Sequence, residues 1–143
     1  MMDFKNELQN YSMIDLERLS ESNPNIPDNI KNSILLYNKA LEDFRAKSED
    51  IAIIELKKAI SLNPDFHEAI NLLGIFYMYI GENDKAAQTF QKVIDAKKNS
   101  IMTMKYLKEI DSDYEPYINK QEKDKKVKNK RGRNRTSNQL SDG

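Results

Sequence analysis

Three features of this chain have residue types that could do chemistry: one histidine, adjacent carboxylates, and a run of basic side chains near the end. His67 has a side chain suited to proton transfer near neutral pH. We expect it near the start of a helix, as a surface residue rather than a base. Glu49 and Asp50 form a carboxylate pair, a type used in acid–base catalysis. They stand where another helix should begin, and the helix dipole favours acidic side chains there.

The rest of the composition argues against catalysis. The chain has no cysteine, which excludes disulfides and thiolate metal sites, and its single histidine cannot form a multi-histidine site. No phosphate-binding loop, metal-ligand spacing or nucleophile–base arrangement is present. We therefore predict a protein that is not an enzyme, uses no cofactor or metal, and takes no small-molecule substrate.

The net charge of zero is the sum of two unlike parts. Residues 1–119 hold 14 Lys and Arg against 20 Asp and Glu, a balance of −6, and residues 120–143 hold 9 against 3, a balance of +6. The basic segment has almost no apolar residues to bury, so we expect it to be disordered. It could be a solubilising tail, fold back on the acidic body, or bind anionic lipid or nucleic acid. No aromatic residue lies among its basic ones, which argues against base stacking. The candidate contacts with an anionic surface are Lys125, Lys126, Lys128, Lys130, Arg131, Arg133 and Arg135.

The elements that would position these groups are helices. Apolar residues recur with helical spacing over residues 29–47, 50–62, 66–80, 84–97 and 101–110. Asp28, Asp65 and Ser100 are suitable N-caps for three of these helices, and Gly81 suits the left-handed position after a helix. Upstream, Ser12 could cap a short helix over residues 13–19, and we expect residues 1–27 to pack on the first repeat described below.

Two of these stretches repeat each other at a spacing of 34 residues. Ala52 corresponds to Ala86 and, upstream, Ala40 corresponds to Gly74. A period of about 34 residues built from two helical patterns is typical of the tetratricopeptide repeat. Residues 67–100 resemble that family closely, through Leu73-Gly74 and Tyr77 on the first helix and Ala86 and Phe90 on the second.

Residues 33–66 resemble the family less. Ala52, Leu56 and Pro64 match its pattern, but Lys39 and Asp43 stand where Leu and Tyr are usual. The resemblance implies an all-α fold: a short solenoid of antiparallel helical hairpins with a C-terminal capping helix and a disordered basic tail. The expected organisation is 1–27 N-terminal segment, 28–66 first, divergent repeat, 67–100 second repeat, 101–115 capping helix and 116–143 tail.

The resemblance also implies where a partner binds, since the first helices of successive repeats line a concave groove in this family. The stretch from residue 69 to 80 is apolar on nearly every side, so it either is buried or exposes a binding stripe. Two arrangements stay open: an open groove, or a stripe covered by the first segment or the fifth helix. The predicted groove residues are Tyr37, Asn38, Leu41, Phe44, Arg45, Asn71, Leu72, Ile75, Met78 and Tyr79.

The function predicted is therefore a small adaptor or scaffold for protein–protein interaction, with a protein or peptide partner in an apolar concave groove. The alternative is a peripheral anchor whose basic tail binds anionic membrane or nucleic acid. Self-association is a third expectation, because two repeats are fewer than the roughly three usually needed for independent stability. No apolar run approaches the length of a membrane span, and the first residues lack the order of a signal peptide. We expect a cytoplasmic, or membrane-peripheral, location.

Overall fold

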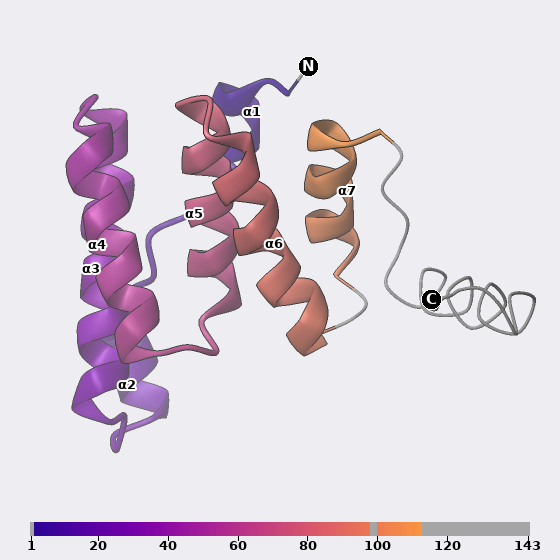
Figure 1. The fold of residues 1–143 in the computed structure, drawn as a ribbon. Helices are drawn as coiled ribbons and strands as arrows, with labels where there is room; N and C mark the ends of the chain where they lie inside the picture. The colour runs from indigo at the N-terminus through magenta and orange to yellow at the C-terminus, as the bar shows by residue number, and fades with distance from the viewer. Residues whose placement is uncertain (1, 98–99, 113–143) are drawn as a thin grey trace, which may run out of the picture. The chain divides into compact units, whose positions relative to one another are not determined.

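A computed structural model of the chain describes residues 2–97 and 100–112. Those residues form seven helices and no strand, which confirms the predicted all-α class for them (Figure 1). The predicted tail lies outside the described residues. The chain divides into two units, residues 1–93 and 94–143. The helices are α1 Phe4–Leu8, α2 Leu16–Ser22, α3 Asp28–Arg45, α4 Glu49–Leu62, α5 His67–Tyr79, α6 Asn83–Lys97 and α7 Ile101–Ile110.

Helices α3 to α7 begin and end within two residues of the predicted bounds, but two of the three predicted N-caps, Asp28 and Asp65, are not the caps. The N-caps of α3 and α5 are Pro27 and Phe66, and neither helix start has a side-chain cap hydrogen bond. Asp28 is instead the first residue of α3, where its charge still meets the positive end of the helix dipole. Ser100 caps α7 as predicted, since its hydroxyl accepts from the backbone N–H of Thr103.

The N-terminal segment forms two short helices where one was expected. Asp15, not Ser12, caps α2 by accepting a hydrogen bond from the backbone N–H of Arg18 at 3.0 Å. Asp3 caps α1 in the same way through the N–H of Asn6. Neither α1 nor α2 has a buried residue. Such short helices depend on contacts with the rest of the chain, because isolated helices of this length are marginal in water.

Small residues allow close contact inside both hairpins. Ala40 on α3 and Ala52 on α4 are fully buried. In the second hairpin, a Cβ added to Gly74 of α5 would overlap the ring of Phe90 on α6, which is itself fully buried. The group nearest to that Cβ is the Phe90 ring. A glycine in a helix costs roughly 1 kcal/mol relative to alanine, and the close approach of that ring explains why it is present.

The two hairpins also end their first helices in the same way. Lys47 after α3 and Gly81 after α5, 34 residues apart, both have positive φ, 67° and 85°. In each case the next residue's N–H bonds back to the helix: Ser48 to Asp43 and Glu82 to Tyr77, both at 2.8 Å. The left-handed position predicted at Gly81 is confirmed. At Lys47 the same turn requires a conformation that side chains disfavour.

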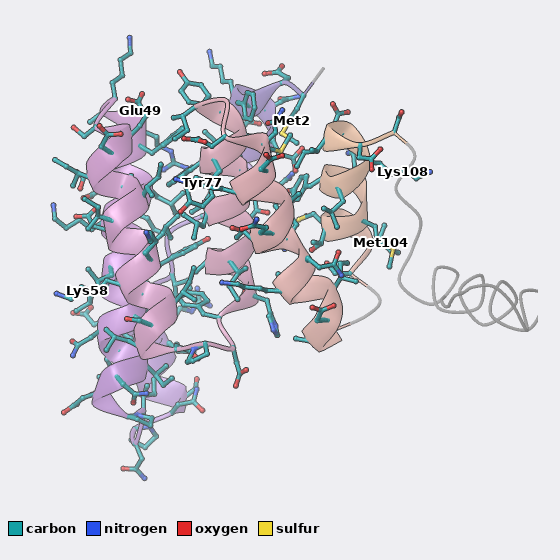
Figure 2. The ribbon with its side chains drawn as sticks, in the orientation of Figure 1. Met2, Glu49, Lys58, Tyr77, Met104 and Lys108 are labelled. Carbon is teal, nitrogen blue, oxygen red and sulfur yellow. The ribbon has the colours of Figure 1, made fainter. Side chains whose placement is uncertain are left out.

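The outer side of α4 faces solvent. Lys58 points outward from it and is exposed (Figure 2), and Ile51 and Ile54 are 53% and 65% exposed. In the second unit, Thr103, Tyr106 and Leu107 of α7 are buried. Among the described residues, no helix has both the length and the apolar character required to span a membrane.

Candidate functional site

Most of the predicted groove residues are buried in the folded chain. Asn38 and Met78 are half-buried, Arg45 is exposed, and Tyr79 is 49% exposed. The other six are buried: Tyr37, Leu41, Phe44, Asn71, Leu72 and Ile75. The side chains that solvent or a partner can reach without rearrangement are therefore at the edge of the stripe.

Residues 2–15, which we call the N-terminal arm, lie against this edge. The backbone N–H of Ile14 donates to Asn38 Oδ1 at 2.8 Å, and Asn38 Nδ2 donates to the carbonyl oxygen of Ile14 at 2.9 Å. Arg45 Nη2 donates to the carbonyl oxygen of Tyr11 at 3.3 Å, and the Tyr11 side chain is buried. The first segment thus contacts the face that the sequence assigned to a partner. Whether a partner also binds there stays a prediction.

An aromatic cluster continues the contact at the other end of the arm. The Phe4 ring meets the Tyr79 ring edge-on with centroids 5.3 Å apart. Tyr79 also meets Phe44 at 5.1 Å, and Phe44 stacks on Phe76 at 3.9 Å and 4°. Offset and edge-to-face pairs stabilise beyond the area they bury. They hold the Tyr79 ring in a defined position although half of it is exposed.

Tyr37 lies in the same face but is no proton acceptor. Burial raises its pKa to about 12, the Glu68 carboxylate adds to that rise, and the Arg45 guanidinium opposes it. Its hydroxyl therefore stays protonated at neutral pH. Its ring packs on Phe66 with centroids 5.0 Å apart, which indicates a structural role.

A polar cluster between α3 and α4 holds the most perturbed carboxyl group. Lys39 Nζ lies 3.5 Å from Asp43 Oδ2 and 3.8 Å from Glu55 Oε2. Glu55 is buried, and this burial, together with the neighbouring Asp43 carboxyl, raises its pKa to about 7, while Lys39 lowers it. Neither carboxyl lines the hollows described below, so the cluster offers no evident place for a substrate. Its expected effect is on stability.

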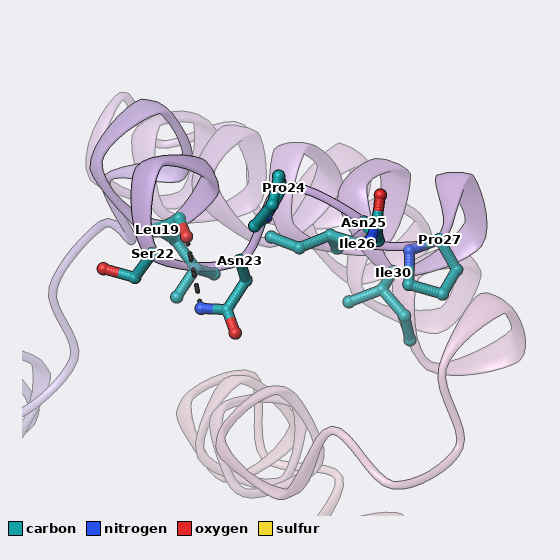
Figure 3. Close-up of a pocket in the computed structure, with 8 residues that line it drawn as sticks. All are labelled: Leu19, Ser22, Asn23, Pro24, Asn25, Ile26, Pro27 and Ile30. Carbon is teal, nitrogen blue, oxygen red and sulfur yellow. Dashed lines mark hydrogen bonds between the residues drawn. The ribbon is translucent and has the colours of Figure 1, made fainter.

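A hollow of about 460 Å³ lies at the turn between α2 and α3 (Figure 3). Its lining runs from Leu19 to Ile30 and contains no titratable side chain. Asn23 Nδ2 already donates to the carbonyl oxygen of Leu19 at 3.3 Å, within this wall. A local turn lined by Asn, Pro and Ile gives neither a catalytic group nor a charge for recognising a ligand.

The three residues singled out for acid–base chemistry lie at the starts of two different helices. His67 is half-buried at the first position of α5, and its Nε2 is shielded without a hydrogen-bond partner. Glu49 and Asp50 lie in the first turn of α4, as expected. Among the residues that the structure describes, no group of three or more His, Cys, Asp or Glu could hold a metal ion.

The sequence indicated the general position of the arm but not its individual contacts. Residues 1–27 were expected to pack on the first repeat, and the first segment was one of the two candidates to cover the stripe. Asn38 was predicted as a groove residue, but Tyr11 and Ile14 were not connected with it. They lie 24 or more residues earlier in the chain, and a bond to a backbone carbonyl or N–H group leaves no signal in the residue type.

Comparison with known proteins agrees with the repeat found in the sequence. Residues 67–100 match a family model described as a tetratricopeptide repeat. They correspond to α5, α6 and the residues that follow α6. Searches of curated proteins and of solved structures gave no match.

Proposed function

The chain contains a tetratricopeptide repeat at residues 67–100, and from this we propose that it is a small adaptor that binds a segment of a partner protein on the face formed by α3 and α5. The repeat indicates a protein–protein interaction scaffold, a class that is generally non-catalytic. The finer assignment, to this face and to a peptide-like partner, is our proposal. A cytoplasmic location and self-association stay predictions.

The observation that carries the proposal is the paired hydrogen bond between Asn38 and Ile14. One carboxamide donates to the carbonyl and accepts from the N–H of the same residue, at 2.9 and 2.8 Å. It therefore contacts backbone groups that every residue except proline possesses. A partner's extended segment could make the same two bonds, and Arg45 could bond its carbonyl oxygen as it now bonds that of Tyr11.

The arm is held by interactions that a partner could replace. The contacts of the arm with α3 and α5 include three hydrogen bonds and one ring pair, and the Tyr11 side chain is buried. A hydrogen bond contributes only about 0.5–1.5 kcal/mol net, and α1 has five residues, none of them buried. We infer that the partner segment displaces the arm. It should present an extended backbone next to Asn38 and an aromatic side chain against Tyr79.

Capture of partners from native lysate with the full chain tests the proposal, followed by titration of each captured protein by calorimetry. The test variant is Asn38→Ala and the matched control is Asn32→Ala, on the exposed side of the same helix. Because the arm makes the same two bonds in the free chain, affinities are compared in a chain without residues 1–14, which keeps the Asp15 cap of α2. There, loss of the two bonds should weaken a partner by about tenfold, or about 1.4 kcal/mol. Equal affinities for the two variants would show that the partner does not use this face.

The basic segment at residues 120–143 supports a second candidate function, because it concentrates 9 Lys and Arg against 3 Asp and Glu. It could anchor the protein to anionic membranes or nucleic acid. The intact chain should then bind anionic vesicles or duplex DNA at low salt, and binding should fade as screening shortens to about 8 Å near physiological salt. A chain without residues 120–143 should bind neither. Equal behaviour of the two chains would leave the segment as a solubilising tail.

A further inference from the structure

A groove runs between α4 and α6 over the surface of α5, on residues 50–92 of the first unit. It consists of two adjoining hollows of about 440 and 280 Å³, which share Lys57, Tyr77 and Lys85 in their linings. Tyr77 lies between α4 and α6 in Figure 2. We call this surface the lysine groove. None of the residues that line it is among the ten predicted groove residues of the concave face.

The floor and walls of the lysine groove are apolar. Leu73 and Tyr77 of α5 form part of the floor, and Ile54 and Ile60 of α4 belong to the wall. Two large apolar side chains of the smaller hollow are left in water: Ile54 is 65% exposed and Ile80 is 42% exposed. Gathered apolar side chains of this kind mark interaction surfaces more often than scattered ones do.

Three ammonium groups border this apolar surface. Lys57 comes from α4, and Lys85 and Lys92 come from α6. The lining of the larger hollow contains no carboxylate, whereas that of the smaller hollow contains Asp50 and Glu82. Lys85 Nζ lies 5.9 Å from the Tyr77 ring centroid and 4.0 Å from Glu82. In the part of the chain that the structure describes, Lys57 and Lys92 make no ion pair. A basic edge on an otherwise acidic body favours an acidic partner.

The same charges argue against a second copy of the chain as the occupant. Two copies whose larger hollows face each other would bring the lysines together, which costs free energy. The chain's own basic segment, residues 120–143, would be repelled for the same reason. An occupant with carboxylates would pair with the lysines instead.

Hydrogen-bonding capacity indicates that the occupant is a helix. The groove walls are helices whose own backbone groups are paired internally. The hydroxyls of Thr89 and Ser61 donate to carbonyl oxygens of their own helices, those of Lys85 and Lys58, each at 2.7 Å. Gln88 is the one carboxamide in the lining of the two hollows. An extended segment would therefore leave most of its backbone groups unpaired here, whereas a helix pairs its own. This differs from the concave face, where Asn38 pairs with both backbone groups of one residue.

We propose that the lysine groove docks an amphipathic helix of a partner protein, with one apolar face bordered by Asp or Glu. The groove follows α4 from Asp50 to Ser61, which at 1.5 Å per residue is about 16 Å and fits about three helical turns. Apolar side chains spaced three and four residues apart would enter the hollows. A chain with two separate docking faces could hold two partners at once.

The probe is a synthetic peptide of about 15 residues, with Leu at helical spacing and Glu on both sides of that stripe. Its control replaces every Glu by Lys. Fluorescence anisotropy with the full chain gives both affinities at low and physiological salt.

The test variant is Lys57→Glu and the matched control is Lys58→Glu, its neighbour, which points outward (Figure 2). A second pair is Ile54→Ser, in the groove, against Ile51→Ser, which lines neither hollow. Circular dichroism verifies that each variant folds.

The acidic peptide should bind the wild type, and the basic peptide should not. Lys57→Glu should weaken binding about fivefold, because it replaces an attraction by a repulsion, while Lys58→Glu should weaken it by less than about twofold. Equal effects of the two reversals would mean that the peptide binds elsewhere, such as on residues 120–143, and would overturn the proposal. So would absence of binding, equal binding of both peptides, or self-association that Lys57→Glu abolishes.

Discussion

The two helical hairpins, α3–α4 and α5–α6, keep the same small residues at their centres but differ beside them. Ala40 and Gly74 correspond at the 34-residue offset, as do Ala52 and Ala86, and all four are buried. Close contact between helices leaves room for nothing larger at these positions. The shared backbone therefore depends on small residues in both hairpins.

Beside those positions the first hairpin is charged and the second is largely apolar. Lys39, Asp43 and Glu55 form the polar cluster between α3 and α4. The positions 34 residues later hold Leu73, Tyr77 and Thr89, which line the larger hollow of the lysine groove. The same arrangement of two helices thus accommodates either charged or mostly apolar side chains at these positions. In one hairpin these positions hold a carboxyl group with a raised pKa, and in the other they form part of an apolar floor on which a partner could dock.

The largest expected effect follows from Gly74→Ala. The added methyl group would overlap the buried ring of Phe90, and overpacking of this kind costs about 1–3 kcal/mol, more than the gain in helix propensity of roughly 1 kcal/mol. Urea denaturation should show a lower midpoint than the wild type. A higher midpoint would mean that the second hairpin is packed more loosely than described.

Substitution of Glu55 should change how stability depends on pH. Its folded pKa of about 7 lies above the ordinary value of 4.5, so the folded state binds the proton more tightly than the unfolded state. The stabilising contribution is therefore complete below pH 4.5 and is lost as pH rises through 7. In Glu55→Gln the free energy of unfolding should decrease less as pH rises from 4.5 to 7. Above pH 7 it should be higher than in the wild type by about 1–3 kcal/mol.

The control for that experiment is Thr89→Val, at the corresponding position of the second hairpin, which should keep the wild-type slope between pH 4.5 and 7. The groups that face Glu55 are Asp43, Lys39 and Glu42. Because the Asp43 carboxyl raises the pKa of Glu55, Asp43→Asn should also reduce the slope. An unchanged slope in Glu55→Gln would contradict the assignment.

The turns after α3 and α5 should respond in opposite directions to exchange of their left-handed residue. Lys47→Gly should raise the free energy of unfolding by about 1 kcal/mol, because glycine adopts positive φ without strain. Gly81→Ala should lower it by about the same amount. Thermal unfolding of both variants, measured against the wild type, tests the equivalence of the two turns. The same sign for both would contradict it.

The smallest effects are expected at the edge that holds the N-terminal arm. Arg45 and Tyr79 are equivalent positions of the two hairpins, and each contacts the arm. Arg45→Ala and Tyr79→Ala should each lower stability by about 1 kcal/mol or less, since both side chains are largely exposed. Hydrogen exchange at the Ile14 amide should become faster in both variants. Unchanged exchange would mean that the arm is held by other contacts.

Local patterns in the sequence predicted the five longer helices. Their bounds follow from the spacing of apolar residues and from breakers such as Pro64 and Gly81, which act over a few residues. The short helix α1 and the cap at Asp15 were missed, because several residues in that segment could cap equally well. In a helix of five residues, tertiary contacts outweigh propensity.

The sequence by itself determined the repeat, its 34-residue period and the small residues that allow its helices to pack closely. Only the tertiary structure decided which apolar residues stay accessible, because burial depends on contacts between residues far apart in the chain. Asn38 meets Ile14 across 24 residues. Lys57 and Lys92 lie 35 residues apart, each on an ordinary polar helix face, and line one hollow only because α4 and α6 flank α5.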